Sequence, residues 1–149
     1  MTDLTEAARR HKVFVPADSP YQRQVRLLQA LWREERKYPI GEHRGPALGS
    51  RLAMPWARKS LANFLTPTIG RIVNYEYANR NQQRKLYGYP RLFDDLLSSQ
   101  PLCFNLFGEL KADFGLASAV LGHLTKGAVE KVTRLEFEHS PRRGDRRFS

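Results

Sequence analysis

One stretch limits the fold of this chain more than any other, the segment 93–111, FDDLLSSQPLCFNLFGELK. Its apolar residues recur at the spacing of one helix face, i, i+3, i+4, i+7 and i+11. These residues are Cys103, Leu106, Phe107, Leu110 and Phe114. Pro101 suits a first helical turn, and Ser98 or Ser99 is placed to cap the free amides before it. We therefore predict a central helix here, with these apolar residues on its core face.

Two amides, Gln100 and Asn105, interrupt this apolar segment. A buried amide without hydrogen-bond partners costs about 1–3 kcal/mol, so each must be satisfied if it is buried. One interpretation is structural, with each amide bracing a neighbouring loop. The other is that both line a functional site, and we keep them as candidate site-lining residues.

The positive charge of the chain is unevenly distributed. The net charge is +10, and residues 1–92 hold 17 Lys and Arg against 7 Asp and Glu. Residues 93–133 hold 3 against 5, and residues 134–149 hold 5 against 3. The excess therefore precedes the central helix. A basic domain attracts polyanions, so DNA is the expected partner; a basic surface without a specific ligand is the alternative.

The N-terminal part is expected to contain a loosely ordered lead and one long helix. Residues 1–18 are assigned to the lead, and Ser19-Pro20 with Gln22 forms an S-x-x-Q capping box that should start the helix. Pro39 should end it. One face carries Val25, Leu28 and Trp32. The opposite face carries Arg23, Arg26, Arg33 and Lys37, either as a solvated surface or as a binding surface.

The middle of the chain offers further basic candidates. Residues 39–50 have the composition of a loop, and Arg51 follows directly, either as an ordinary surface side chain or as a phosphate contact. Helical patterns follow over residues 55–65 and from Pro67, with Thr66 as its cap. The connector 79–91 holds the candidates Arg80, Arg84 and Lys85, which either contact a phosphate backbone or belong to a plain solvated loop.

The C-terminal part changes from a helical to a strand pattern. Residues 114–124 continue helical, and residues 129–139 are predicted to form a strand because apolar residues alternate there. Glu136 and Glu138 would share the polar face, either as metal ligands or as its solvated side. A basic tail, 140–149, follows. We expect a single domain over residues 19–149 that is helical over 19–126.

Composition excludes several other classes of protein. The four histidines show no metal-ligand spacing with each other or with Cys103, which is expected to be a buried structural thiol. A single cysteine cannot form an internal disulfide and fits a cytoplasmic setting. No stretch of about 18 apolar residues is present, so no membrane span is expected, and the charged N-terminus does not resemble a secretory signal.

Three stretches carry a family resemblance: GPALGSRLAMPWARKSLANFLTPTI, LFDDLLSSQPLCFNLFGELK and LEFEHSPRRGD. Over about residues 45–149 the chain resembles the restriction-endonuclease-like family of the PD-(D/E)XK nuclease superfamily. The resemblance implies an α/β fold, with a central mixed sheet between helices, and magnesium-dependent cleavage of DNA. It places Glu138 at the end of a first strand as a catalytic and Mg²⁺-binding residue, and Gln100 and Asn105 on the preceding helix.

The same resemblance implies that the catalytic strands are absent from this chain. The superfamily holds its metal with an Asp on one strand and an Asp/Glu-x-Lys on the next. Glu109-Leu110-Lys111 spells this motif, but residues i and i+2 of a helix do not face each other, so we reject it. We expect the N-terminal part of the α/β/α fold, mostly helical with one or two strands and inactive alone. An exposed sheet edge would then favour a homo-oligomer. A non-catalytic DNA-binding remnant and a helical interaction protein are the alternatives.

Overall fold

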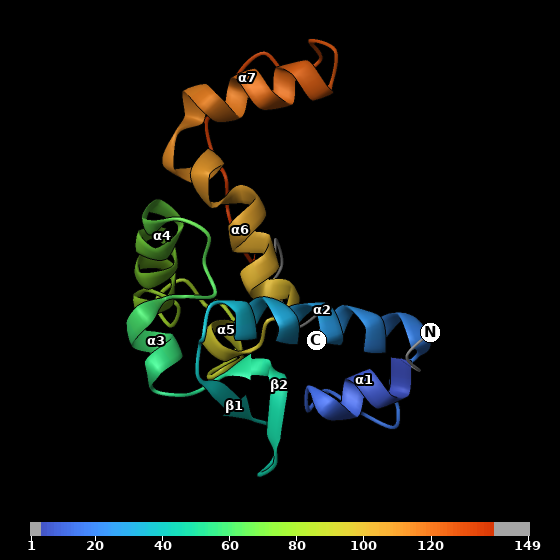
Figure 1. Cartoon of the computed structure of the whole chain (residues 1–149). Coiled ribbons are helices and arrows are strands. Elements are labelled where there is room, and N and C mark those ends of the chain that lie inside the picture. Colours follow the sequence, from blue (N-terminus) through green and yellow to red (C-terminus); the bar gives the residue numbers. More distant parts are fainter. Residues whose placement is uncertain (1–3, 139–149) are drawn as a thin grey trace, which may run out of the picture. The chain divides into compact units, whose positions relative to one another are not determined.

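The computed structural model describes residues 4–138 and shows a mixed α/β chain that is mostly helical, as predicted (Figure 1). Within the stretch expected as a single domain, contacts define two compact units. Unit 1 comprises residues 4–63 and 88–102, and unit 2 comprises residues 64–87 and 103–138. None of the helices in the described part is long and apolar enough to span a bilayer.

Unit 1 contains a short antiparallel hairpin covered by a helix. Strands β1 (Ile40–Glu42) and β2 (Ala47–Leu52) pair, and helix α2 (Pro20–Glu35) contacts β2 (Figure 1). Helices α3 (Trp56–Ser60) and α5 (Arg91–Asp94) contact each other, and α5 contacts β2. Most of the hairpin lies in the segment 39–50 that we predicted to be a loop, and β2 extends to Leu52. That prediction was wrong because its turn residues join two strands that are too short to show a period.

The described part of the predicted N-terminal lead, residues 4–18, contains a helix. Residues Leu4–Arg10 form helix α1, which contacts α2. Ala8 and Val13 are fully buried and form a small apolar cluster with Ala30 of α2. Gly49 of β2 donates its backbone N–H to Lys12 O at 2.8 Å, which ties the end of the lead to the hairpin.

The local start and stop signals of α2 were predicted correctly, but its faces were not. Ser19 Oγ and the Gln22 side chain form the reciprocal capping box. Arg33, however, is buried and donates from Nε to Gly49 O at 2.9 Å and from Nη1 to Tyr38 O at 3.0 Å. Leu28 and Leu31 are exposed instead. Two residues of the predicted arginine face, Arg26 and Arg33, therefore point to the hairpin, whereas Lys37 is exposed.

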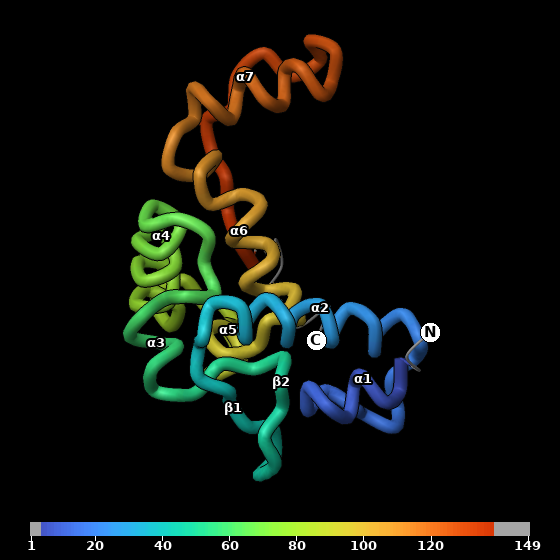
Figure 2. Tube along the Cα trace, in the orientation of Figure 1, coloured from blue at the N-terminus to red at the C-terminus, as the bar shows by residue number. Residues whose placement is uncertain are grey.

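Unit 2 contains helices α4 (Pro67–Ala78) and α7 (Phe114–Leu124), together with most of α6 (Ser99–Ala112). Thr66 caps α4 as predicted. Phe104 is the centre of an aromatic cluster, with ring centroids 5.5 Å from Tyr87 and 4.2 Å from Phe137. The segment after α7 returns along α6, where Lys111 Nζ donates to Leu135 O at 2.7 Å (Figure 2).

The helical character of segment 99–112 is confirmed, and Ser98 Oγ accepts the N–H of Gln100 at its start. The predicted core face is displaced. Phe104 and Gly108 are buried, whereas Cys103, Leu106 and Phe107 are exposed. Because apolar residues surround most of this helix, their period does not single out one face.

The strand predicted over 129–139 is absent from its described part. Residues 129–138 are irregular: Phe137 fills the aromatic cluster and Glu138 has a left-handed φ of 54°. Val129, Val132 and Leu135 are half-buried and Phe137 is buried, so within the described residues this segment covers its apolar side chains without pairing as a strand. Residue 139 and the basic tail 140–149 lie outside the described residues.

Candidate functional site

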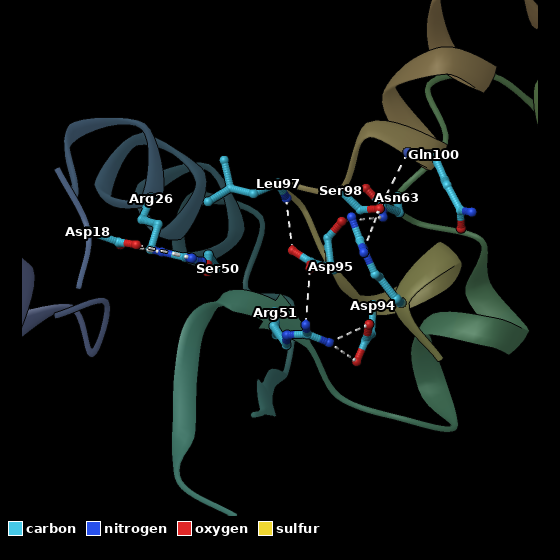
Figure 3. Close-up of polar contacts among 11 residues, drawn as sticks. Asp18, Arg26, Ser50, Arg51, Asn63, Asp94, Asp95, Leu97, Ser98 and Gln100 are labelled. Atoms are coloured by element: carbon cyan, nitrogen blue, oxygen red, sulfur yellow. Dashed lines mark hydrogen bonds and ion pairs between the residues drawn. The ribbon is translucent and has the colours of Figure 1, made fainter. Parts of the chain in front are cut away.

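A buried polar network lies in unit 1, beside β2 (Figure 3). Arg51 Nη1 donates to both carboxylate oxygens of Asp94, at 2.9 and 3.0 Å, and Nη2 donates to Asp95 Oδ2 at 3.0 Å. The exposed fractions of these side chains are 12% for Arg51, 5% for Asp94 and 15% for Asp95. A planar guanidinium matches two carboxylates in this way, and the contacts fix α5 against β2.

The same network binds the chain on either side of Asp95. Asn63 Nδ2 donates to the Asp95 carbonyl at 3.3 Å, and Asp95 Oδ1 accepts the N–H of Leu97 at 3.1 Å. At the preceding position of β2, Ser50 Oγ accepts from Arg26 Nη1 at 3.2 Å, and Arg26 also pairs with Asp18 (Figure 3). Successive residues of β2 are thus each satisfied by an arginine-centred contact.

The pKa of Asp94 shows that burying its carboxylate in this network is unfavourable. Burial raises the pKa of the Asp94 carboxyl above its ordinary value, and the Arg51 guanidinium only partly offsets that effect. The Arg51 guanidinium is engaged by two carboxylates, of which Asp94 is buried and Asp95 is half-buried. The network is suited to holding α5 and β2 together rather than to binding an external anion.

A second buried network lies in unit 2, centred on Glu76 of α4. This carboxylate is 1% exposed and accepts from Lys85 Nζ at 2.6 Å and from Tyr87 Oη at 3.0 Å. Lys111 Nζ lies 3.2 Å from its other oxygen. One carboxylate thus joins α4, the connector 79–87 and α6 of the same unit.

The Glu76 network shifts two pKa values in opposite directions. Burial acts to raise the pKa of Glu76, but the hydrogen bonds from Lys85, Tyr87 and Lys111 outweigh it, so the pKa is lowered from the ordinary 4.5. Burial and then the Glu76 charge raise the pKa of Tyr87. Glu76 is therefore ionised and Tyr87 is a neutral donor at neutral pH.

The four predicted nucleic-acid-binding residues occupy different environments. Arg51 and Lys85 are the largely buried partners of carboxylates, so the structure gives both of them internal contacts. Arg80 is half-buried, with its guanidinium over the Tyr77 ring and bonded to Tyr77 O. Arg84 is exposed, at a left-handed φ of 53°. Of these four, only Arg84 is exposed.

The two predicted site-lining amides brace loops. Gln100 Oε1 accepts the N–H of Gly88 at 3.0 Å within unit 1, and Asn105 Oδ1 accepts the N–H of Leu65 at 3.0 Å within unit 2. The structural interpretation of both amides is thus confirmed by their hydrogen bonds. A further role in lining a site stays a prediction.

Glu138 does not lie in a set of metal ligands. It is exposed, and its charge raises the pKa of Tyr87 and of the Cys103 thiol, after the larger effect of burial. Phenol and thiol groups are poor ligands for Mg²⁺, which prefers carboxylate oxygens. Between residues 4 and 138, no three His, Cys, Asp or Glu side chains are grouped to hold a metal. The described residues therefore do not fit a magnesium site.

Sequence reasoning missed the central carboxylates of both networks. Glu76 falls at i+7 of the apolar pattern that starts at Ile69, and a carboxylate on an apolar helix face is a signal for an internal ion pair. Asp94 and Asp95 gave no comparable signal, because their partner Arg51 lies more than 40 residues earlier. The rejection of Glu109-x-Lys111 holds, since both lie on α6 and bind Thr66 and Glu76 respectively.

Comparison with known proteins identifies the class of this chain. A family model described as the PD-(D/E)XK nuclease superfamily matches residues 16–149, so the chain belongs to that superfamily. No curated protein and no solved structure matches it.

Proposed function

We propose that this chain serves a metal-dependent DNA endonuclease and that residues 1–149 bind DNA through exposed basic side chains. The observation that carries the proposal is membership of a nuclease superfamily over residues 16–149. The net charge of +10 supports DNA as the partner. We further propose a cytoplasmic location, because a single cysteine cannot form an internal disulfide and disulfides are rare in that compartment.

The distribution of ion pairs supports DNA binding by surface groups. The internal carboxylates Asp18, Asp94 and Glu76 are paired with cations of the same unit. These networks are close to charge-balanced, so the positive excess belongs to side chains outside them. The exposed basic residues include Lys37, Arg44, Lys59, Arg71, Arg84, Lys126 and Lys131. Such a surface suits contacts with phosphates without reading bases.

We propose that DNA cleavage requires acidic ligands beyond those that the described residues bring together. In the assay, the chain of 149 residues is titrated into a fluorescein-labelled duplex at several salt concentrations, and plasmid nicking is followed with Mg²⁺ and with EDTA. We expect salt-sensitive binding, with no nicking above the level in EDTA. Absence of binding at low salt would refute DNA as the partner. Mg²⁺-dependent nicking that is lost in Glu138→Ala would refute the proposed inactivity.

Single variants separate surface cations from internal ones. Arg84→Ala should reduce the slope of log affinity against log salt by about one, as loss of one phosphate contact does. Lys85→Met is the matched control from the next residue, because Lys85 is bound to Glu76. It should leave the slope unchanged. Equal slopes for both variants would remove Arg84 from the interface.

Exposed apolar side chains favour a second candidate, a helical interaction module. On α6 and α7 within unit 2, the exposed apolar side chains are Leu106, Phe107, Phe114, Leu116 and Leu124. Contiguous exposed apolar side chains are typical of interaction surfaces. We also retain the proposal of a homo-oligomer, although the strand predicted over 129–139, whose edge was expected to mediate it, is absent from its described part. Light scattering across a concentration series tests both: a monomer at all concentrations would speak against self-association.

A further inference from the structure

Unit 1 also holds a cavity with basic side chains, distinct from the networks described above. It has a volume of about 340 Å³ and is lined by residues from the end of α1, from the following segment and from the hairpin β1–β2. Small-molecule pockets commonly measure about 300–1,000 Å³, so this cavity falls at the lower end of that range. Both of its walls belong to the same unit.

The rim of this cavity is basic. Arg9 and Lys12 line it from the α1 side, and His43 lines it from the hairpin side. No carboxylate is among its lining residues, and Glu42, which precedes His43, lines a different cavity. Within residues 4–138, neither Arg9 nor Lys12 forms an ion pair, whereas Arg10 pairs with Glu6. Two cations and an imidazole therefore line one cavity, and no carboxylate is among its lining residues.

The inner surface of the cavity is apolar and flat-sided. Phe14, Pro16, Pro46 and Leu48 contribute to it. The guanidiniums of Arg9 and Arg23 lie over the Phe14 ring, 4.8 and 5.0 Å from its centroid. These stacked contacts hold the Arg9 side chain in place without using a carboxylate. An occupant should thus combine an anionic group with a flat body of low polarity.

We propose that this cavity binds a 5′-phosphorylated nucleotide, with the phosphate at Arg9 and Lys12 and the base against the apolar wall. Phosphate matches the two cations. The guanidiniums of Arg9 and Arg23 cover the Phe14 ring, so the base would lie against Pro16, Pro46 and Leu48. The choice of a nucleotide rests on the proposed function, DNA binding. The nucleotide is either free or the 5′-terminal residue of a strand, and both present the same chemistry to the cavity.

The test compares two substitutions that differ only in place. Lys12 and Lys37 are both exposed lysines of unit 1 with left-handed φ, 56° and 54°. Asparagine tolerates this conformation, so Lys12→Asn and Lys37→Asn each remove one charge at little backbone cost. Only Lys12 lines the cavity. A third variant, Ala47→Trp, fills the cavity without changing charge, and an aromatic residue suits its strand position.

Binding of dAMP and of inorganic phosphate is measured by calorimetry. Binding of one single-stranded oligonucleotide, with either a 5′-phosphate or a 5′-hydroxyl, is measured by anisotropy. We expect Lys12→Asn to weaken dAMP binding, or the preference for the 5′-phosphate, about tenfold or more. Ala47→Trp should do the same. Lys37→Asn should keep both the dAMP affinity and the preference for the 5′-phosphate, even where its lost charge weakens the binding of both oligonucleotides equally. Binding of dAMP would indicate a free nucleotide, and a 5′-phosphate preference alone would indicate a strand end.

Two results would overturn the proposal. One is that the unmodified chain neither binds dAMP nor distinguishes the two oligonucleotides. The other is that Lys12→Asn and Lys37→Asn behave alike with every probe, including the case in which phosphate alone binds both equally. Loss of nucleotide binding with retained duplex binding would refute this cavity and leave the proposed function standing. Nucleotide binding without duplex binding would support this cavity and refute the proposed binding of duplex DNA.

Discussion

Replacing Glu76 should selectively destabilise unit 2, and the structure allows the size of the effect to be worked out. The carboxylate is 1% exposed, and its partners Lys85 and Lys111 are only 10% and 18% exposed along their side chains. Removing one partner of a buried ion pair costs about 3–5 kcal/mol. Two uncompensated ammonium groups and the Tyr87 hydroxyl would remain. Since both lysines keep some access to water, we expect about 3 kcal/mol for Glu76→Leu.

A combined variant tests whether the cost comes from stranded charge. Replacing a whole buried ion pair with apolar residues of similar volume is often close to neutral. The variant Glu76→Leu, Lys85→Met, Lys111→Met, Tyr87→Phe should therefore be more stable than Glu76→Leu alone. Lys85→Met alone should cost less than Glu76→Leu, because Lys111 still pairs with the carboxylate.

The assay must report on unit 2. Both tryptophans, Trp32 and Trp56, lie in unit 1, so tryptophan fluorescence reports on that unit. Hydrogen exchange followed by mass spectrometry resolves peptides within 64–87 and 103–138, where protection should fall in Glu76→Leu. Glu130→Gln, an exposed carboxylate of the same unit, is the control and should change stability by less than about 0.5 kcal/mol.

The pH dependence gives the sign of the effect independently. The folded-state pKa of Glu76 is lowered from the ordinary 4.5, so its contribution to stability is present above pH 4.5. That contribution is lost as the pH falls through the lowered folded value. The unmodified chain should thus lose protection in unit 2 on acidification more steeply than Glu76→Gln does. Equal acid sensitivity of the two, or full protection in Glu76→Leu, would refute the role given to this carboxylate.

Two further predictions concern unit 1. Arg51→Ala leaves Asp94 buried without its cation, so the urea midpoint seen by tryptophan fluorescence should fall by an amount equivalent to about 3 kcal/mol, with the DNA salt slope unchanged; a lower slope with unchanged stability would instead favour a phosphate contact. Gly49→Ala places a Cβ 2.2 Å from His11 O and should cost about 2 kcal/mol or more in the same assay. Gly88→Ala, whose Cβ would meet its nearest atom at 3.6 Å, is the matched control and should be tolerated.

Local signals predicted where helices begin, and non-local contacts decided what the helices face. The capping box at Ser19 and the Thr66-Pro67 start both formed as expected, because each depends on residues within one turn. The hairpin was missed because its strands span three and six residues and pair by contacts that the pattern does not show. The resemblance to the nuclease superfamily supplied the class, which residue patterns alone did not.

The burial of Arg33 in place of Leu28 and Leu31 on α2 shows why an apolar pattern is insufficient. Placing Leu28 and Leu31 inward buries apolar surface, but it leaves the carbonyl of Gly49 and the hydroxyl of Ser50 without these donors. An unsatisfied buried polar group costs about 1–3 kcal/mol, comparable to the gain of about 1.5–3 kcal/mol from burying a leucine. Arg33 and Arg26 satisfy both acceptors while their aliphatic stems still cover the hairpin.

The fold thus uses some arginines as internal hydrogen-bond donors and leaves other cations for the surface. This division changes how the charge of +10 should be understood, because Arg26, Arg33 and Arg51 count toward it but are held in internal contacts. The number of basic residues therefore exceeds the number of available phosphate contacts. We therefore expect the slope of log affinity against log salt for duplex binding to depend on the exposed cations. Lys85→Met should leave this slope unchanged.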